Sequence, residues 1–291
     1  MVKEKILITG SSGFVGKNLI HQLSDENYNF TKLSLRNNDW GKELKQADVD
    51  TYIHLAGIAH DVAKVNDDKI YYDVNYELTM KLYDCFLKDE KANKFIFFSS
   101  VKAAADQPEQ ILTEDVKPNP KTAYGKSKLM AENYILDNLP LDKKVFILRP
   151  CMIHGTGNKG NLNLLHNFIA KGFPYPFGDF KNKRSFISID NVCFIINELI
   201  KNENIKSGIY NIADDDSLST VDLVKTMGKA MNKNPSIYNI PKPIIHLIAK
   251  VGDVLPLPIN SERAQKLTEN YVVSNEKIKL AIKKDLPLTA V

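Results

Sequence analysis

A glycine-rich turn directly after the first apolar segment constrains the fold more than any other feature. Residues 5–9 are predicted to form a buried parallel strand, and Gly10, Gly13 and Gly16 follow in a GxxGxxG pattern before helical spacing begins. In such a unit the first glycine permits the tight turn, the second lets the backbone approach a pyrophosphate, and the third lets helix and strand pack closely. N–H groups at the helix N-terminus attract phosphate. The turn therefore predicts a dinucleotide site.

Apolar runs and segments of helical spacing alternate along the chain after this turn. Strands are predicted at residues 5–9, 30–35, 51–55, 94–99, 145–148 and 208–212, and helices at 16–23, 74–87, 123–139, 162–170, 190–201 and 220–231. The alternation predicts an α/β fold with a doubly wound parallel (Rossmann) sheet. We expect a dinucleotide-binding domain over residues 1–160 and a smaller, mainly substrate-binding region over 161–291, with 185–215 returning to the main sheet.

The end of the second predicted strand bears on which dinucleotide binds. An acidic residue there binds the ribose 2′-hydroxyl of NAD, whereas an arginine accommodates the 2′-phosphate of NADP. No acid occupies this strand end; Ser34 and Arg36 stand there, and Asp39 comes only later. The sequence therefore favours NADP(H), with NAD(H) as the alternative; Arg36 as a plain surface charge is the competing interpretation.

Tyr124 and Lys128 are four residues apart in a predicted helix, so both project from one face. An ammonium near a phenol favours the phenolate and lowers the phenol pKa from about 10. Such a tyrosine can donate or accept a proton near neutral pH. Ser100 follows the fourth predicted strand, at the carboxyl edge where open α/β sheets bind ligands. Its hydroxyl is expected to hold a substrate oxygen for Tyr124.

Composition and charge exclude several other classes of protein. The chain is 43% apolar and 25% charged, which is ordinary for a globular protein, and its net charge of +4 makes no case for a nucleic-acid partner. The three cysteines are far apart and odd in number, so no metal site is expected. There is no signal-peptide pattern, and the apolar residues 243–251 are too few to span a membrane. A cytoplasmic protein without a membrane partner is expected.

These residues resemble the extended short-chain dehydrogenase/reductase family, which comprises nucleotide-sugar epimerases, dehydratases and reductases. The matching segments cover nearly the whole chain and include residues 9–16, 54–56, 99–100, 124–128 and 148–150. The resemblance implies that Ser100, Tyr124 and Lys128 are catalytic. It implies cofactor contacts from Gly10, Ser12, Gly13, Phe14, Val15, Gly16, Ser34, Arg36, Leu55, Ala56, Gly57, Asn75, Ser99, Tyr124, Lys128 and Pro150.

Two later segments, residues 160–162 and 184–190, resemble the parts of the family that bind the nucleotide diphosphate. Arg184 suits this role because its planar fork of donors matches phosphate, although a surface salt bridge is the alternative. The implied substrate contacts are Ser100, Lys102, Tyr124, Asn161, Leu162, Phe177 and Arg184. The resemblance stops within 286–291, where relatives usually continue as a helix, so a further tail is expected.

The chain also departs from the family pattern near Ser100. The family's common Val-Tyr-Gly is replaced by Ala103, Ala104 and Ala105, so the sugar pocket is expected to differ from that of galactose epimerases. Val101 and Lys102 stand where a 4,6-dehydratase needs two acids, which disfavours that class. Residues 98–102 and 149–155 look most like a bacterial polysaccharide subgroup that acts on UDP-linked N-acetylhexosamines.

Three functions follow from these observations. The first is NADPH-dependent reduction of a UDP-4-keto-6-deoxy-N-acetylhexosamine at C4, in surface polysaccharide biosynthesis. The second is a UDP-glucose or UDP-N-acetylglucosamine 4-epimerase with tightly bound NAD, which would use the same three residues. The third is a non-catalytic NADP-binding sensor, disfavoured because Tyr124 and Lys128 are both present. The resemblance also implies a homodimer through helices 74–87 and 123–139.

Overall fold

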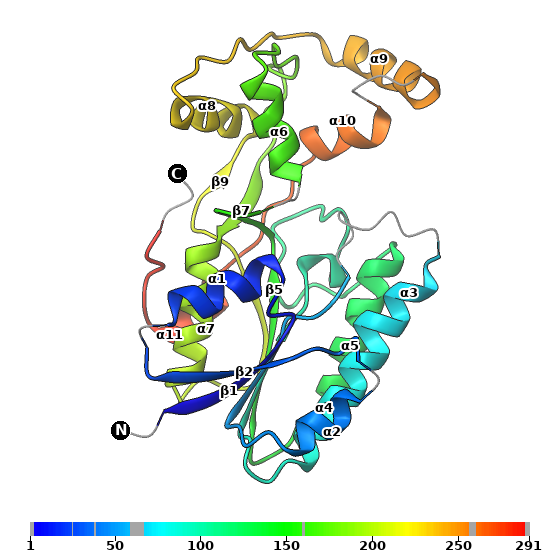
Figure 1. Ribbon diagram of the computed structural model, residues 1–291. Helices are drawn as coiled ribbons and strands as arrows, with labels where there is room; N and C mark the ends of the chain where they lie inside the picture. Colours follow the sequence, from blue (N-terminus) through cyan, green and yellow to red (C-terminus); the bar gives the residue numbers. More distant parts are fainter. Residues whose placement is uncertain are drawn as a thin grey trace.

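The computed structural model in Figure 1 describes residues 3–24, 26–37, 39–58, 67–158, 161–255 and 260–288. Its main sheet has six parallel strands in the order β2-β1-β3-β4-β5-β8. The strands are β1 (Glu4–Thr9), β2 (Tyr28–Leu33), β3 (Thr51–His54), β4 (Lys94–Phe98), β5 (Lys144–Pro150) and β8 (Gly208–Ile212). The predicted doubly wound sheet is confirmed, and its strand order reverses between β1 and β3, where such sheets bind ligands.

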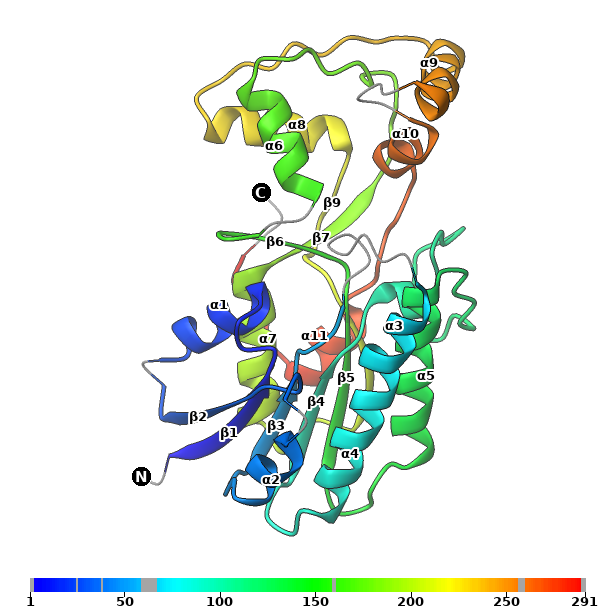
Figure 2. The same cartoon turned by 45° about the vertical axis from the view of Figure 1, so that its right-hand side comes forward.

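Helices cover both faces of this sheet (Figures 1 and 2). One face carries α1 (Phe14–Gln22), α7 (Ile189–Lys201) and α11 (Glu276–Ile282), and the other carries α2 (Trp40–Lys45), α3 (Lys69–Tyr71), a π-helix η1 (Tyr72–Glu77), α4 (Leu78–Lys88) and α5 (Ala123–Asp137). Successive residues of β1 enter opposite cores: Ile6 and Ile8 pack on the first face and Leu7 on the second. Burial on both sides explains why these strands are continuously apolar.

Parts of the chain after residue 150 build a smaller lobe beyond the carboxyl end of β5, while α7, β8 and α11 belong to the main sheet and its helices. A three-stranded sheet of β6 (Met152–His154), β7 (Arg184–Ser188) and β9 (Ser217–Leu218) leads into it. The lobe itself holds α6 (Asn161–Ala170), α8 (Thr220–Ala230), α9 (Lys242–Val254) and α10 (Ser261–Thr268) around an apolar core of their own (Figure 2).

Most predicted elements appear in the structure within a few residues of the expected bounds. The expected strand at 208–212 is β8 and pairs with β5, whereas β7, which overlaps the start of 185–215, belongs to the smaller sheet. The helix predicted at 74–87 is divided, because it begins as η1 and continues as α4. The helices α2, α9, α10 and α11 were not predicted. Among the described residues, no helix has both the length and the apolar character needed to cross a membrane.

Candidate active site

The glycine turn leaves no room for a side chain where it packs against its neighbours. Gly10 has a φ of 70°, and a Cβ there would lie 2.7 Å from the backbone nitrogen of Ala56. A Cβ on Gly16 would lie 2.5 Å from the carbonyl oxygen of Gly10. Gly13 precedes α1 and offers no side chain to cap its first turn. Only glycine therefore fits at residues 10 and 16, and the N–H groups at the start of α1 have no side-chain cap that would compete with a phosphate.

The turn after β2 presents Ser34 and Arg36 to solvent, while Leu35 between them is buried. Asp39 lies further along, directly before α2, and forms an ion pair with Lys42 at 2.8 Å. The Asp39 side chain nevertheless stays 72% exposed. Ser34, Arg36 and Asn37 are exposed polar residues between the end of β2 and this acid.

Buried His54 connects three elements beneath the glycine turn, a role that the sequence analysis missed. Its Nδ1 lies 2.7 Å from Thr9 Oγ1, which also accepts from the Ala56 N–H at 3.2 Å, and its Nε2 lies 2.9 Å from Thr79 Oγ1. Burial, aided by the charge of Lys128, lowers the pKa of His54 to about 3. The ring is therefore neutral near pH 7, with Thr9 donating to Nδ1 and Nε2 donating to Thr79. The chain of bonds ties β1 to β3 and α4.

Asn75 lies in the π-helix η1 and connects two predicted cofactor segments. Its side chain accepts from the Ile58 N–H at 2.8 Å and donates to the Ile58 carbonyl at 3.1 Å and to Ser127 at 3.3 Å. A Cβ on Gly57 would lie 2.9 Å from Asn75 Oδ1 and 3.3 Å from Lys128 Nζ. The structure thus brings Gly57, Asn75 and Lys128 together beside the half-buried Leu55 and Ala56.

Lys128 is buried at the carboxyl end of β4. Its Nζ donates to the Phe98 carbonyl at 2.8 Å and lies 4.8 Å from the centre of the Phe97 ring. Burial lowers the pKa of this ammonium to about 8, and the negative charge of Glu132 opposes the shift. Lys128 therefore sits close to the boundary between its charged and neutral forms at physiological pH.

A buried ion pair that the sequence analysis also missed lies behind Lys128. Arg149 donates through Nε to Glu132 at 2.9 Å and through Nη2 at 2.5 Å, and both side chains are at most 1% exposed. Ser99, the residue before Ser100, donates to the same carboxylate. Glu132 follows Lys128 by four residues in α5, and this spacing was the one available signal. The pair joins α5, β5 and the end of β4 directly below the predicted catalytic residues.

Ser100 and Tyr124 begin two segments that pack closely on each other. Ser100 accepts the Lys102 N–H at 3.2 Å and is almost buried. Tyr124 is in the first turn of α5, where a Cβ on neighbouring Gly125 would lie only 2.5 Å from the Lys102 carbonyl. The Tyr124 ring is partly exposed and meets the edge of Tyr71 at 6.1 Å between centroids. Close backbone packing therefore sets α5 against the segment that holds Ser100.

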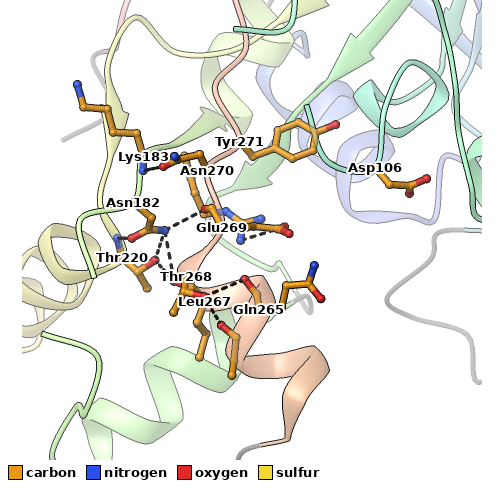
Figure 3. A network of polar contacts seen from close by, with 12 residues as sticks. Asp106, Asn182, Lys183, Thr220, Gln265, Leu267, Thr268, Glu269, Asn270 and Tyr271 are labelled. Atoms are coloured by element: carbon orange, nitrogen blue, oxygen red, sulfur yellow. Dashed lines mark hydrogen bonds and ion pairs between the residues drawn. The ribbon is translucent and has the colours of Figure 1, made fainter. Parts of the chain in front are cut away.

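Tyr271 approaches the same segment from the far end of the chain (Figure 3). Its hydroxyl donates to the Ala105 carbonyl at 2.6 Å, and Lys102 Nζ lies 4.4 Å above its ring. Asn182 holds the segment before Tyr271 by donating to the carbonyls of Leu267 at 3.3 Å and Glu269 at 3.2 Å (Figure 3). Tyr271 thus lies beside Ala105, which belongs to the alanine run that stands in place of the family's Val-Tyr-Gly.

The remaining predicted residues occupy several different environments. Arg184 begins β7 and lies 3.7 Å from Glu269. Phe177 is 1% exposed between Tyr175 and Phe180, so its ring belongs to the core of the smaller lobe. Pro150 is the last residue of β5, and Asn161 and Leu162 are the first two residues of α6. Phe14 and Val15 pack against the core on the α1 face of the main sheet, and Ser12 is exposed. Gly160 lies outside the described residues.

The fold and these residues define a dinucleotide-dependent enzyme with a serine, a tyrosine and a lysine at the carboxyl edge of its sheet. The model of the NAD dependent epimerase/dehydratase family matches residues 6–213. The chain belongs to this family, and its resemblance to the extended short-chain dehydrogenases/reductases is thereby confirmed.

Individual relatives agree with this assignment. The chain is 31% identical to a UDP-glucose 4-epimerase of Vibrio cholerae, over 83% of this chain and 79% of the relative. It is 27% identical to the N-acetyl-alpha-D-glucosaminyl-diphospho-ditrans,octacis-undecaprenol 4-epimerase of Escherichia coli O157:H7, over 96% and 85%. The fold is similar to that of UDP-N-acetylglucosamine 4-epimerase from Bacillus cereus, with a TM-score of 0.77 at 20% identity over 99% and 95% of the two chains.

Proposed function

We propose that this chain reduces the 4-keto group of a UDP-4-keto-6-deoxy-N-acetylhexosamine with NADPH. The observation that carries the proposal is the turn after β2, where Ser34 and Arg36 are exposed and the nearest acid is paired with Lys42. Such a turn suits a 2′-phosphate better than a free ribose 2′-hydroxyl. A cell keeps NADPH for reductions, so a preference for it supports net reduction rather than a redox-neutral epimerisation.

Each residue has a definite part in this reaction. When bound, the cofactor supplies the hydride that reaches C4. Ser100 donates a hydrogen bond to the C4 oxygen, and Tyr124 donates a proton to the same oxygen as negative charge develops there. Lys128 binds the nicotinamide ribose and favours the phenolate that Tyr124 becomes. Arg184 and Lys102 bind the diphosphate of the substrate.

A UDP-hexose or UDP-N-acetylhexosamine 4-epimerase is the second candidate. It is favoured because the two relatives described above are 4-epimerases. Chemistry at C4 is common to both candidates, since Tyr124 would remove the proton and then return it. The two differ in cofactor use: an epimerase retains NAD and shows no net oxidation, whereas a reductase consumes one NADPH in each turnover.

The decisive experiment incubates the protein with UDP-4-keto-6-deoxy-GlcNAc and NADPH. We expect a loss of absorbance from NADPH and a UDP-linked 6-deoxy-N-acetylhexosamine as the product by NMR. A parallel sample with UDP-GlcNAc or UDP-glucose and no added cofactor tests the epimerase, and mass spectrometry identifies any dinucleotide that the purified protein retains. Retained NAD with conversion at C4, and no oxidation of NADPH, would replace the reductase by the epimerase.

Substituting Arg36 should change the preference between the two dinucleotides. We expect Arg36→Asp to raise KM for NADPH roughly 10- to 100-fold, because a charge-assisted hydrogen bond to phosphate contributes about 1.5–3 kcal/mol. KM for NADH should fall, since the new carboxylate can accept from the ribose 2′-hydroxyl. Lys45→Asp, at an equally exposed position of α2, should leave the ratio unchanged. An unaltered ratio in Arg36→Asp would count against the assigned 2′-phosphate site.

The pH dependence of kcat/KM should report on Lys128. Because its pKa is about 8, activity that depends on the ammonium should decline as the pH rises through this value. Glu132 raises the pKa of Lys128, so Glu132→Gln should move the alkaline decline to lower pH. Glutamine keeps the shape of the side chain, and a profile that does not move would contradict this electrostatic role.

A further inference from the structure

Helix α9 exposes an apolar surface that the proposed reaction does not use. Its 13 residues bury only Ile245 and Ala249, which anchor it to the core of the smaller lobe. The side chains of Ile244, Leu247, Ile248, Val251, Val254 and Leu255 are between 38% and 86% exposed. The spacing of three and four residues places the first five on one continuous arc of the helix, and Leu255 follows directly as its C-cap residue. We call this arc the α9 apolar face.

The other residues of α9 form a polar side and a buried side, as in an amphipathic helix at an interface. Polar residues Lys242, His246, Lys250 and Asp253 share another side, and the buried Ile245 and Ala249 lie between this side and the apolar face. Asp253 accepts from the Ser261 N–H at 2.8 Å and from its hydroxyl at 2.6 Å, so its carboxylate is engaged at the start of α10. Lys250 borders the apolar face, where a cation can reach anionic headgroups.

The position of α9 gives this face free access to a large partner. Both views place α9 at the outer end of the smaller lobe, far from the main sheet and from the helices α4 and α5 (Figures 1 and 2). The pairing expected from the resemblance would use α4 and α5 and would leave α9 uncovered. A flat surface could therefore meet α9 without blocking the dinucleotide site.

The net charge of the smaller lobe indicates which kind of partner suits the α9 apolar face. Residues 161–183 and 217–271 contain ten Lys and Arg against five Asp and Glu, so this part carries more excess charge than the +4 of the whole chain. A lobe with net positive charge that carries an exposed apolar helix is complementary in charge to an anionic lipid surface. A second copy of the same chain would bring an equally basic lobe against it, which like-charge repulsion opposes.

We infer that α9 docks this protein on anionic lipid bilayers, lying in the plane of the interface with its apolar face among the acyl chains. Thirteen residues are too few to span a bilayer, and α9 is held by Ile245 and Ala249, so attachment is peripheral and reversible. The inference goes beyond the proposed reaction and does not depend on which sugar is bound.

Vesicle flotation of the full chain tests this inference. We expect binding to phosphatidylcholine vesicles that contain phosphatidylglycerol, weaker binding to phosphatidylcholine alone, and further weakening by salt. The double variant Leu247→Asp/Val251→Asp should reduce binding roughly tenfold or more, because it puts charge into the apolar face. Lys250→Gln should reduce binding to the anionic vesicles roughly fivefold.

A matched control separates docking from general stickiness. Leu141 and Leu280 are 106% and 77% exposed but lie outside α9. Leu141→Asp/Leu280→Asp should bind vesicles like the unmodified protein, and circular dichroism should show that both double variants are folded. Failure of the unmodified protein to float, or equal losses in the two double variants, overturns the inference. The inference is also overturned if the unmodified protein is an oligomer that does not bind vesicles and the α9 double variant is a smaller species on size exclusion.

Discussion

Replacing Tyr124 by phenylalanine should lower kcat about a thousandfold, since general acid catalysis by a positioned side chain typically contributes 10²–10⁴-fold. The change removes one hydroxyl from a ring that is partly exposed in the first turn of α5 and packs on Tyr71. Phenylalanine keeps that packing, so we expect the fold and the Kd for NADPH to be nearly unchanged. Single-turnover kinetics with UDP-4-keto-6-deoxy-GlcNAc would measure the loss in the chemical step.

Tyr71→Phe is the matched control for this experiment. It removes a hydroxyl from the ring that meets Tyr124 edge to face, but Tyr71 has no assigned part in proton transfer. We expect less than a threefold change in kcat. Comparable losses in the two variants would show that packing rather than proton donation sets the rate, and an active Tyr124→Phe enzyme would remove the proposed acid altogether.

Local sequence patterns were sufficient to predict the parts of the site that lie on short segments. The glycine pattern is visible in residues 10–16 alone, although the structure adds that a Cβ on Gly10 would meet the backbone of Leu55 and Ala56. Tyr124 and Lys128 share one helix, so their relation was predictable from spacing. The paired Asp39 and the exposed Arg36 likewise lie within a few residues of each other.

Residues that depend on distant packing could not be predicted in this way. His54 is neutral because it is buried, and Thr9 and Thr79, from two other elements, provide the partners of its two ring nitrogens. Tyr271 reaches Ala105 across 166 residues of sequence, a contact that no local pattern contains. Helix α9 was not predicted. Its apolar residues are too few to span a membrane, as expected, and which of them are exposed depends on how the smaller lobe packs.

Helix α5 unites the predicted and the missed parts of the site. Tyr124, Lys128 and Glu132 recur every four residues and so follow one face of α5 from its first turn inward. Tyr124 is partly exposed, Lys128 is buried at the end of β4, and Glu132 is fully buried against Arg149. The charge that tunes Lys128 is thus held by the core, which couples the chemistry of the site to the stability of the fold.

Glu132→Ala should therefore destabilise the protein by about 3–5 kcal/mol, the usual cost of leaving a buried charge without its partner. Arg149 is 1% exposed, and its Nη1 already lacks a hydrogen-bond partner among the described residues. Without the Glu132 carboxylate, its Nε and Nη2 would lose their acceptors as well, and Ser99 would lose its own. Urea unfolding at constant pH, followed by circular dichroism, measures the loss.

A variant without either charge shows whether Glu132→Ala loses stability through the unpaired charge of Arg149 or through the smaller side chain at residue 132. Glu132→Leu/Arg149→Met fills much of the same volume with apolar groups and leaves no buried charge, so it should regain most of the stability lost in Glu132→Ala. The alkaline decline of its kcat/KM should lie at lower pH than in the unmodified protein, because Lys128 still lacks the carboxylate that raises its pKa. A double variant as unstable as Glu132→Ala would mean that the ion pair is needed for packing. An alkaline decline at the same pH as in the unmodified protein would contradict the electrostatic link between Glu132 and Lys128.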